Sequence, residues 1–483
     1  MKTASLYWRN CSTKTSPNKF IQEAYMKEKK SVFGAVDLLH GPILPALVTF
    51  MIPIFISYLF QQLYNAVDTA RVGNLLGTSS LAAVGACASV FEFMVGFMMS
   101  LGNGFSIVVA RAFGSQDEKR MKKAIAISIV IGLLTTLVFT VFSIAGMEWL
   151  LVLIDTPAEI LGEAMAYIQV IGIGVIVMFL YNYASGILRS IGNSFMPLVF
   201  LVFSSLLNIV LDYAFMKWFG LGVAGAALAT VVSQGASAVG CIGYILMKEK
   251  QLVPSAKDFV LDKELIQDLA GQGYSMAFMG SIVSVGSIIL QSGINGLGTE
   301  IIAGHVAARK VYAIMNLPFM AMSMAVSTFV SQNKGCNQGK RILSAMKTAY
   351  IFDVVAAVGI SALLWFTAPF LIHLISGSDS AVIIGNGSRF LYIVGPFYAV
   401  LGVLIQTRFA LQGIGSKILP LFSSVIECVG KILFTFFLIP LFGYEAVIWC
   451  EPVIWCVMTV ELLISFYTNS YIRETMKAST TRQ

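Results

Sequence analysis

The stretch AIAISIVIGLLTTLVFTVFSIAG, residues 124–146, carries no charged side chain and follows the charged segment DEKRMKK at 117–123. An α-helix rises about 1.5 Å per residue, so this stretch is long enough to cross the roughly 30 Å hydrocarbon core of a bilayer. Backbone N–H and C=O groups cannot be left unpaired in lipid, so an apolar segment of this length must be helical. The stretch therefore predicts a membrane-spanning helix.

The composition of the chain extends this prediction to most of its length. Of its 483 residues, 57% are hydrophobic and only 12% are charged, where a soluble protein averages about 25% charged residues. These values exclude a soluble enzyme and a disordered chain, and they predict an all-α membrane protein with twelve spans. The predicted spans are 43–67, 82–109, 124–146, 162–187, 197–216, 221–246, 273–294, 301–329, 347–372, 389–411, 420–441 and 446–468.

The lysines and arginines indicate the orientation. If the N-terminus is cytoplasmic, twenty-five of them fall in cytoplasmic segments and three in external ones, as the positive-inside rule requires. The first forty residues contain no apolar signal-peptide core, so they are expected to form a cytosolic tail. The sequence therefore predicts a multi-pass protein of the cell membrane with both termini cytoplasmic. The net charge of +7 is explained by topology, without a nucleic-acid partner.

An internal repeat divides the chain into two halves. Leu76-Gly77-Thr78 recurs 221 residues later as Leu297-Gly298-Thr299, and Ile191-Gly192 recurs 223 residues later as Ile414-Gly415. Each copy has six spans, so both enter the membrane from the same side and are related by a pseudo-twofold axis along the membrane normal. The predicted organisation is a cytosolic tail (1–41), an N-lobe (42–246), a cytosolic linker (247–272), a C-lobe (273–468) and a second cytosolic tail (469–483).

Four polar side chains in the N-lobe form the candidate coupling site. Asp212 lies about 22 Å along its helix from Pro197, and Asn208 shares its helix face. Thr230 and Asp68 fall at similar depths, so the four can converge into an oxygen-rich site for a proton or a small hard cation such as Na⁺. Two other interpretations stay open: Asp68 as a solvated helix cap, and Asp212 as a helix-packing hydrogen-bond partner.

The second repeat lacks these acids. Asp68, Asn208 and Asp212 correspond to Ile289, Lys431 and Thr435, so the candidate site belongs to one lobe only. Lys431 follows Glu427 by four residues on the same helix, and the two are expected to neutralise each other rather than bind a substrate.

Other intramembrane residues have weaker indications of function. Pro53 kinks the first span, either as a static feature or as a hinge that couples Asp68 to movement. Glu92 and Arg309 either line a central cavity or pair with partners that the sequence does not identify. Met315 belongs to a group of methionines that suits an adaptable apolar pocket, although such residues also face lipid or pack in cores. No metalloprotease, nucleotide-binding or hydrolase motif is present, so we expect a transporter without cofactor, driven by an ion gradient, and not an enzyme.

The sequence resembles the multidrug and toxic compound extrusion (MATE) family over nearly its whole length. The segments that carry the resemblance are YNAVDTARVG (64–73), LRSIGN (188–193), NIVLD (208–212), GVAGAALAT (222–230) and STFVSQN (327–333). The resemblance implies a V-shaped pair of lobes that exports organic cations and other amphiphiles in exchange for H⁺ or Na⁺. It also implies that Asp68, Asn208, Asp212 and Thr230 hold the coupling ion, that Tyr167 supports them and that Pro53 bends the first helix.

Two alternatives stand beside multidrug export by a monomer embedded in the lipid bilayer. A flippase for lipid-linked oligosaccharides, from the same superfamily, is expected to need a large polar cavity with several arginines, whereas only Arg309 and Arg408 are candidates here. A membrane-embedded enzyme is disfavoured by the missing motifs.

Overall fold

A computed structural model describes residues 34–480, and within this range it contains helices and no strand. Twelve helices in this range are long and apolar enough to cross a membrane, which confirms the predicted number. The spans of the first half are α3 (Ile43–Leu76), α5 (Ala88–Gly114), α6 (Glu118–Ala145), α8 (Ala158–Ser190), α9 (Phe195–Tyr213) with the π-turn Ala214–Trp218, and α10 (Gly222–Lys248). Those of the second half are α11 (Lys263–Asn295), α12 (Thr299–Met315) with α13 (Leu317–Gly335), α14 (Gly339–Ser376), α15 (Ala381–Ile414), α16 (Ile418–Leu433) with the π-turn Phe434–Leu438 and α17 (Ile439–Phe442), and α18 (Tyr444–Thr468).

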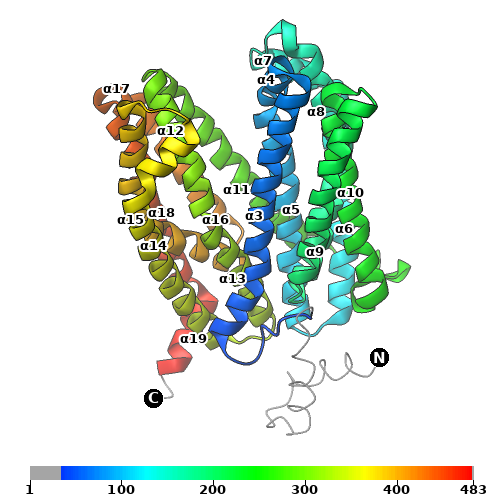
Figure 1. Cartoon of the computed structure of the whole chain (residues 1–483). Coiled ribbons are helices and arrows are strands. Elements are labelled where there is room, and N and C mark those ends of the chain that lie inside the picture. The colour runs from blue at the N-terminus through cyan, green and yellow to red at the C-terminus, as the bar shows by residue number, and fades with distance from the viewer. Residues whose placement is uncertain (1–33, 481–483) are drawn as a thin grey trace.

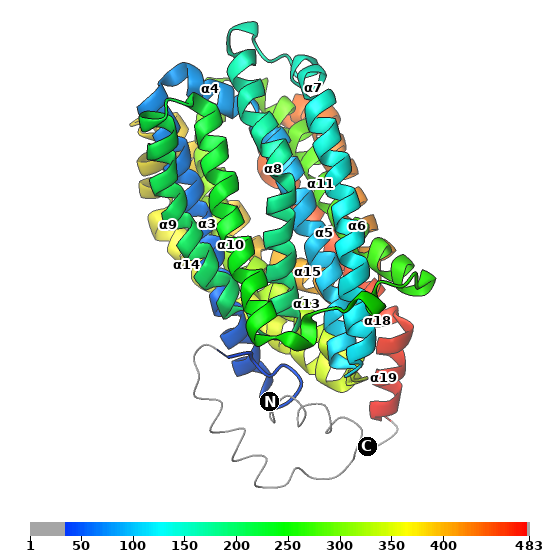
Figure 2. The same ribbon diagram turned by 90° about the vertical axis from the view of Figure 1, so that its right-hand side faces the viewer.

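The spans form two lobes that lie side by side as a V (Figure 1). The N-lobe holds α3–α10 and the C-lobe holds α11–α18. The lobes meet at the end where α3 begins and where α19 (Ser470–Thr480) lies, and they diverge toward the end that holds the short helices α4 (Thr78–Ala86), α7 (Met147–Leu153) and α17. Figure 2 shows the long helices of the N-lobe running roughly parallel to one another.

The backbone repeats as the sequence does. Gly77 and Gly298 have φ of 93° and 101°, and each directly precedes a helix that begins with threonine. Gly192 and Gly415, the matching residues after the fourth span of each half, have φ of 92° and 100°. This left-handed region is costly for residues with a Cβ atom, so glycine is required at both copies of each turn. The two lobes are therefore copies of one six-helix unit in conformation as well as in sequence.

Some helix limits differ from those expected. The eighth span is divided at Asn316 into α12 and α13, because Pro318 in the first turn of α13 has no N–H to continue the preceding helix. The seventh span, α11, begins at Lys263, inside the stretch 247–272 assigned to the linker, where the side chain of Asp262 caps it by accepting from the Leu265 N–H. Hydropathy alone misses the segment 263–272 of this helix because it contains polar and charged residues.

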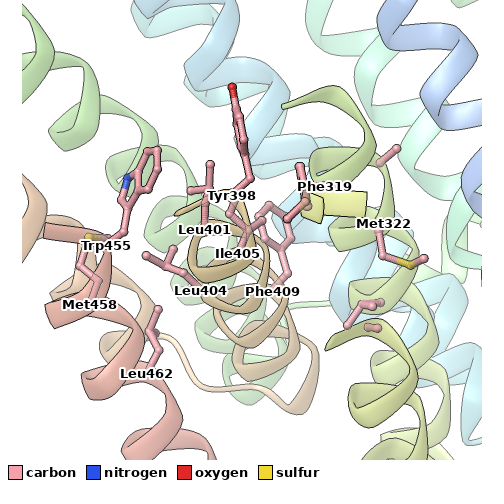
Figure 3. Packing of buried hydrophobic residues seen from close by; sticks show 14 of the residues in the cluster. Phe319, Met322, Tyr398, Leu401, Leu404, Ile405, Phe409, Trp455, Met458 and Leu462 are labelled. Atoms are coloured by element: carbon pink, nitrogen blue, oxygen red, sulfur yellow. The ribbon is translucent and has the colours of Figure 1, made fainter. Parts of the chain in front are cut away.

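The outer faces of the lobes expose large apolar side chains, and the interior of the C-lobe is closely packed. On the outside of α6 and α14, large apolar residues such as Val138 and Phe366 are 67% and 82% exposed, as suits contact with lipid. Inside the C-lobe, residues of α13, α15 and α18 pack together (Figure 3). Phe319 and Tyr398 stack with ring centroids 5.7 Å apart, a geometry that favours a defined packing over a fluid one.

Candidate functional site

The two N-lobe carboxyl groups meet between α3 and α9. Asp212, at the end of α9, is fully buried, and the carboxyl of Asp68 on α3 is close enough to share a proton with it. Within residues 34–480, neither forms an ion pair with a lysine or an arginine. The nearest positive charge is Arg71, whose guanidinium donates to the Ile209 carbonyl instead. Two adjacent carboxyls without a cationic partner cannot both stay ionised in a low-dielectric interior unless a cation joins them.

Neutral hydrogen-bonding groups surround this pair. Asn208, one turn before Asp212, donates its amide N–H to Asp212 Oδ1 at 3.4 Å. Thr230 on α10 accepts from the Tyr64 hydroxyl at 3.1 Å, and Tyr64 lies one turn before Asp68 on α3. The structure therefore brings together all four residues that depth and polarity selected from the sequence, and three helices contribute to them.

The oxygen atoms of this cluster have unused acceptor capacity. Asp68 Oδ1, Asn208 Oδ1 and Asp212 Oδ2 are buried and accept no hydrogen bond from any residue in the described range. A buried acceptor without a partner costs roughly 1–3 kcal/mol, and a bound proton or a small hard cation would remove that cost. The donor set of two carboxylates, an amide and a hydroxyl fits H⁺ or Na⁺ as a transported ion. The described residues include no group of three or more His, Cys, Asp or Glu side chains placed to hold a metal ion.

Of the two supporting residues, Tyr167 lies close to this cluster, and Pro53 lies fifteen residues before Asp68 on the same helix. Tyr167 on α8 is 5% exposed, and its hydroxyl lies within electrostatic range of Asp68, Tyr64 and Asp212. Pro53 lies inside α3, which stays helical through it, and the Ser57 hydroxyl donates to the Pro53 carbonyl at 2.8 Å. The structure thus places Tyr167 beside the site and Pro53 in the helix that carries Asp68, while their roles stay predictions.

The three proposed cavity residues have different surroundings. Glu92 is exposed near the start of α5. Arg309 on α12 pairs with Glu451 of α18 at 2.7 Å, so it has the partner that sequence alone did not identify. Met315, at the end of α12, is partly buried against the C-lobe core. Their part in a cavity remains untested.

At the place where the N-lobe has the acid pair, the C-lobe has a mixed charge cluster. Lys431 Nζ lies 2.9 Å from Glu427 Oε1, as expected, and it also donates to Ser287 at 2.9 Å. The structure adds Arg408, whose guanidinium is 3.8 Å from Glu427 and donates to the Ser423 hydroxyl at 3.0 Å. Arg408 lies on another helix, so no spacing rule could have linked it to this pair.

Comparison with known proteins supports the same architecture. The MatE family model matches residues 53–214 and again residues 275–437. The "Probable multidrug resistance protein YpnP" of Bacillus subtilis is 30% identical over 79% of this chain and 84% of its own length. The "Multidrug export protein MepA" of Staphylococcus saprophyticus is 23% identical over 89% and 92%.

Among solved structures, a multidrug resistance MATE family transporter in an outward-facing conformation superposes with a TM-score of 0.82 at 24% identity. The match covers 93% of this chain and 99% of that one, so the fold is shared throughout. A MATE structure in complex with MaL6 has a TM-score of 0.81 at 25% identity and covers 92% and 99%. The two matches of the family model, the relative at 30% identity and the shared twelve-helix fold show that this chain belongs to the MatE family of membrane transporters.

Proposed function

We propose that this protein exports amphiphilic organic cations across the cell membrane in exchange for H⁺ or Na⁺, as a monomer with both termini cytoplasmic. One observation carries the proposal: the carboxyl pair Asp68 and Asp212 forms no ion pair with a lysine or an arginine in the described chain and has buried acceptor oxygens without a hydrogen-bond donor. Such a pair can bind and release a proton or a cation without a large rearrangement of the protein. A site for a coupling ion needs this property.

The relatives support a drug-like substrate class. YpnP and MepA are named for multidrug resistance and multidrug export, and this chain covers most of the length of both. The flippase alternative is disfavoured because Arg309 pairs with Glu451, and Arg408 is held by Glu427 and Ser423. Neither arginine is free to line a large polar cavity.

Close packing at the meeting end of the lobes supports alternating access. The C-terminal ends of α5 and α13 meet there, and a Cβ atom at Gly114 would overlap the carbonyl oxygen of Gln332. The matching residue in the other repeat, Gly335, is seated in the same way on the carbonyl of Arg111. Cys336 donates to the Gly114 carbonyl at 2.6 Å in the same contact. This symmetric backbone contact closes one end of the V and must separate when the transporter opens there.

The glycine contact gives the first prediction. Gly114→Ala should prevent full closure of this end, because the methyl group meets backbone and not a flexible side chain. We expect gradient-driven export to fall at least tenfold. We also expect maleimide to label Cys336 faster, measured in a variant whose other cysteines are replaced by serine or alanine.

Gly96→Ala is the matched control, because Gly96 lies on the same helix with nothing within 4 Å of the added methyl. Gly335→Ala should behave like Gly114→Ala. Normal export and unchanged Cys336 labelling in Gly114→Ala would show that this contact is not the inner closure.

Transport itself is tested with the wild-type protein in everted membrane vesicles. A fluorescent lipophilic cation should accumulate in the lumen when the lumen is more acidic than the medium or holds more Na⁺ than the medium, and the gradient that drives accumulation identifies the coupling ion. A lipid-linked oligosaccharide reporter should not move. No cation accumulation under either gradient would contradict the proposal.

A further inference from the structure

The N-lobe contains a small cavity whose lining residues do not include Asp68 or Asp212. Its volume is about 30 Å³, and α3, α5, α8 and α9 enclose it. Besides two tyrosines, seven polar or charged residues line it: Ser57, Gln61, Asn103, Asn182, Ser185, Arg189 and Ser194. No aspartate or glutamate is among the lining residues.

Arg189, in the last turn of α8, supplies the charge in this cavity. Its guanidinium donates to Ser185 Oγ at 2.6 Å and to Asn103 Oδ1 at 3.1 Å. Its Nε–H is buried and has no partner among residues 34–480. No carboxylate in that range lies within 4 Å of it, in contrast to Arg111, Arg309 and Arg408, each of which has an acidic partner.

The positive charge of Arg189 has no carboxylate beside it, so another source of negative charge is needed to stabilise it. The carbonyl end of α8 offers only about half an elementary negative charge, and its effect falls off within the last turn. That partial charge does not replace a full negative charge beside a guanidinium whose Nε–H is buried. The hydrogen bonds to Ser185 and Asn103 direct the guanidinium without neutralising it.

The rest of the cavity offers donors and no competing negative charge. The Asn182 amide uses one N–H for the Met178 carbonyl, at 2.8 Å, and has a second N–H to give. Gln61 contributes another amide, and Ser57 a hydroxyl. A cavity needs about 10–15 Å³ to hold one water molecule, so this one holds two waters or one chloride ion and excludes an organic anion.

The second repeat replaces most of this polar lining. Under the repeat offsets, Ser57, Gln61, Asn103 and Asn182 correspond to apolar residues, and Arg189 corresponds to a neutral amide. The matching residues of the C-lobe are Phe278, Ile282, Met324, Ile405 and Gln412. Ser185 corresponds to Arg408, which has the carboxylate of Glu427 3.8 Å away. The arginine of the second repeat therefore has a counter-charge from the protein, whereas Arg189 has none among residues 34–480.

We propose that the cavity around Arg189 is a binding site for one small monovalent inorganic anion, with chloride as the ion of the right size. The bound ion accepts from the Arg189 guanidinium and from the amides of Asn182 and Gln61. It supplies a counter-charge to Arg189, which has no carboxylate partner among residues 34–480. The site is separate from Asp68 and Asp212, and its occupancy does not depend on transport.

The test is thermal unfolding of the purified wild-type protein in detergent, in potassium chloride and in potassium gluconate at equal ionic strength. Gluconate is too large for the cavity. We expect Tm to rise with chloride concentration and to saturate, since a ligand that binds only the folded state stabilises it by mass action. Equal Tm values in the two salts across the titration would overturn the proposal.

Two variants locate the effect. Arg189→Gln, which places the second repeat's residue in the cavity, should abolish the chloride-dependent shift. Gln61→Ile leaves Arg189 in place and should raise the apparent chloride Kd at least tenfold, so the test holds even if Arg189→Gln fails to fold. Gln62→Ile, the same change at the exposed neighbouring position on α3, is the matched control. A wild-type chloride response in Gln61→Ile and in a folded Arg189→Gln would place the anion elsewhere.

Discussion

Asp212→Asn is expected to abolish gradient-driven export while the protein still inserts and folds. The amide keeps the shape of the side chain and can still accept from Asn208, and a neutral group is cheaper to bury than a carboxylate. What it loses is the ability to take up and release the coupling ion together with Asp68. Asp68→Asn should show the same defect less severely, because Asp68 is only partly buried and Asp212 is fully buried.

The size of the effect follows from the energy that one ion supplies. One charge moving down 100 mV provides about 2.3 kcal/mol, and each tenfold substrate gradient costs about 1.4 kcal/mol, neglecting the charge of the substrate. A single coupled ion therefore sustains roughly a fiftyfold gradient, all of which should collapse in Asp212→Asn. The measurement is accumulation of the fluorescent cation in everted vesicles, with Tm and expression recorded alongside.

Asp353→Asn is the control for burial alone. Asp353 on α14 in the C-lobe is also fully buried, and its Oδ1 accepts from Gln406 at 3.1 Å. It has no second carboxyl beside it, so its replacement should leave coupling intact. Wild-type export by both Asp212→Asn and Asp68→Asn at normal expression would remove the coupling role from this site.

Glu427→Gln is expected to lower the stability of the C-lobe by about 3–5 kcal/mol. The substitution leaves two buried cations, Lys431 and Arg408, without the carboxylate that lies 2.9 Å and 3.8 Å from them. An unpaired buried charge is far more costly than a missing pair, so Glu427→Gln combined with Lys431→Gln should recover a large part of the loss. Thermal unfolding and chymotrypsin resistance in detergent measure both.

Glu445→Gln provides the comparison for this prediction. Glu445 pairs with Arg389 at 2.7 Å, but their side chains are 42% and 58% exposed. Water replaces the lost partner there, so the change should cost about 0–1 kcal/mol. Equal destabilisation by the two substitutions would mean that the Glu427 cluster is solvated and does not stabilise the lobe.

Features that depend on local composition or on spacing along the chain were predictable from sequence. Apolar length identified the twelve spans, because the cost of bare backbone groups in lipid leaves no other structure. The recurrence of Gly77 and Gly192 as Gly298 and Gly415 identified the two lobes, because a left-handed turn requires glycine wherever it is repeated. The pairing of Glu427 with Lys431 followed from their shared helix face.

The acid pair was predictable for a different reason. Asp68 and Asp212 are far apart in the chain, but the bilayer confines each helix to a known direction, so counting residues from a helix end gives depth. Depth limits which side chains can meet, and it placed Asp68, Asn208, Asp212 and Thr230 at one level. It did not show the Tyr64–Thr230 hydrogen bond or that Arg71 turns to the Ile209 carbonyl.

Contacts that depend on how helices rotate and pack against one another appear only in the folded molecule. Arg408 joins Glu427 across two helices, and Arg111 of α5 meets Asp268 of α11, which also pairs with Lys417. The cavity around Arg189 requires four helices to enclose it. Rotation about a helix axis is set by the packing of all neighbouring side chains, a collective property that has no signature in local sequence. The number of spans and the two-lobe repeat were therefore predictable from the sequence, while the partners that buried charges find on other helices were decided by tertiary packing.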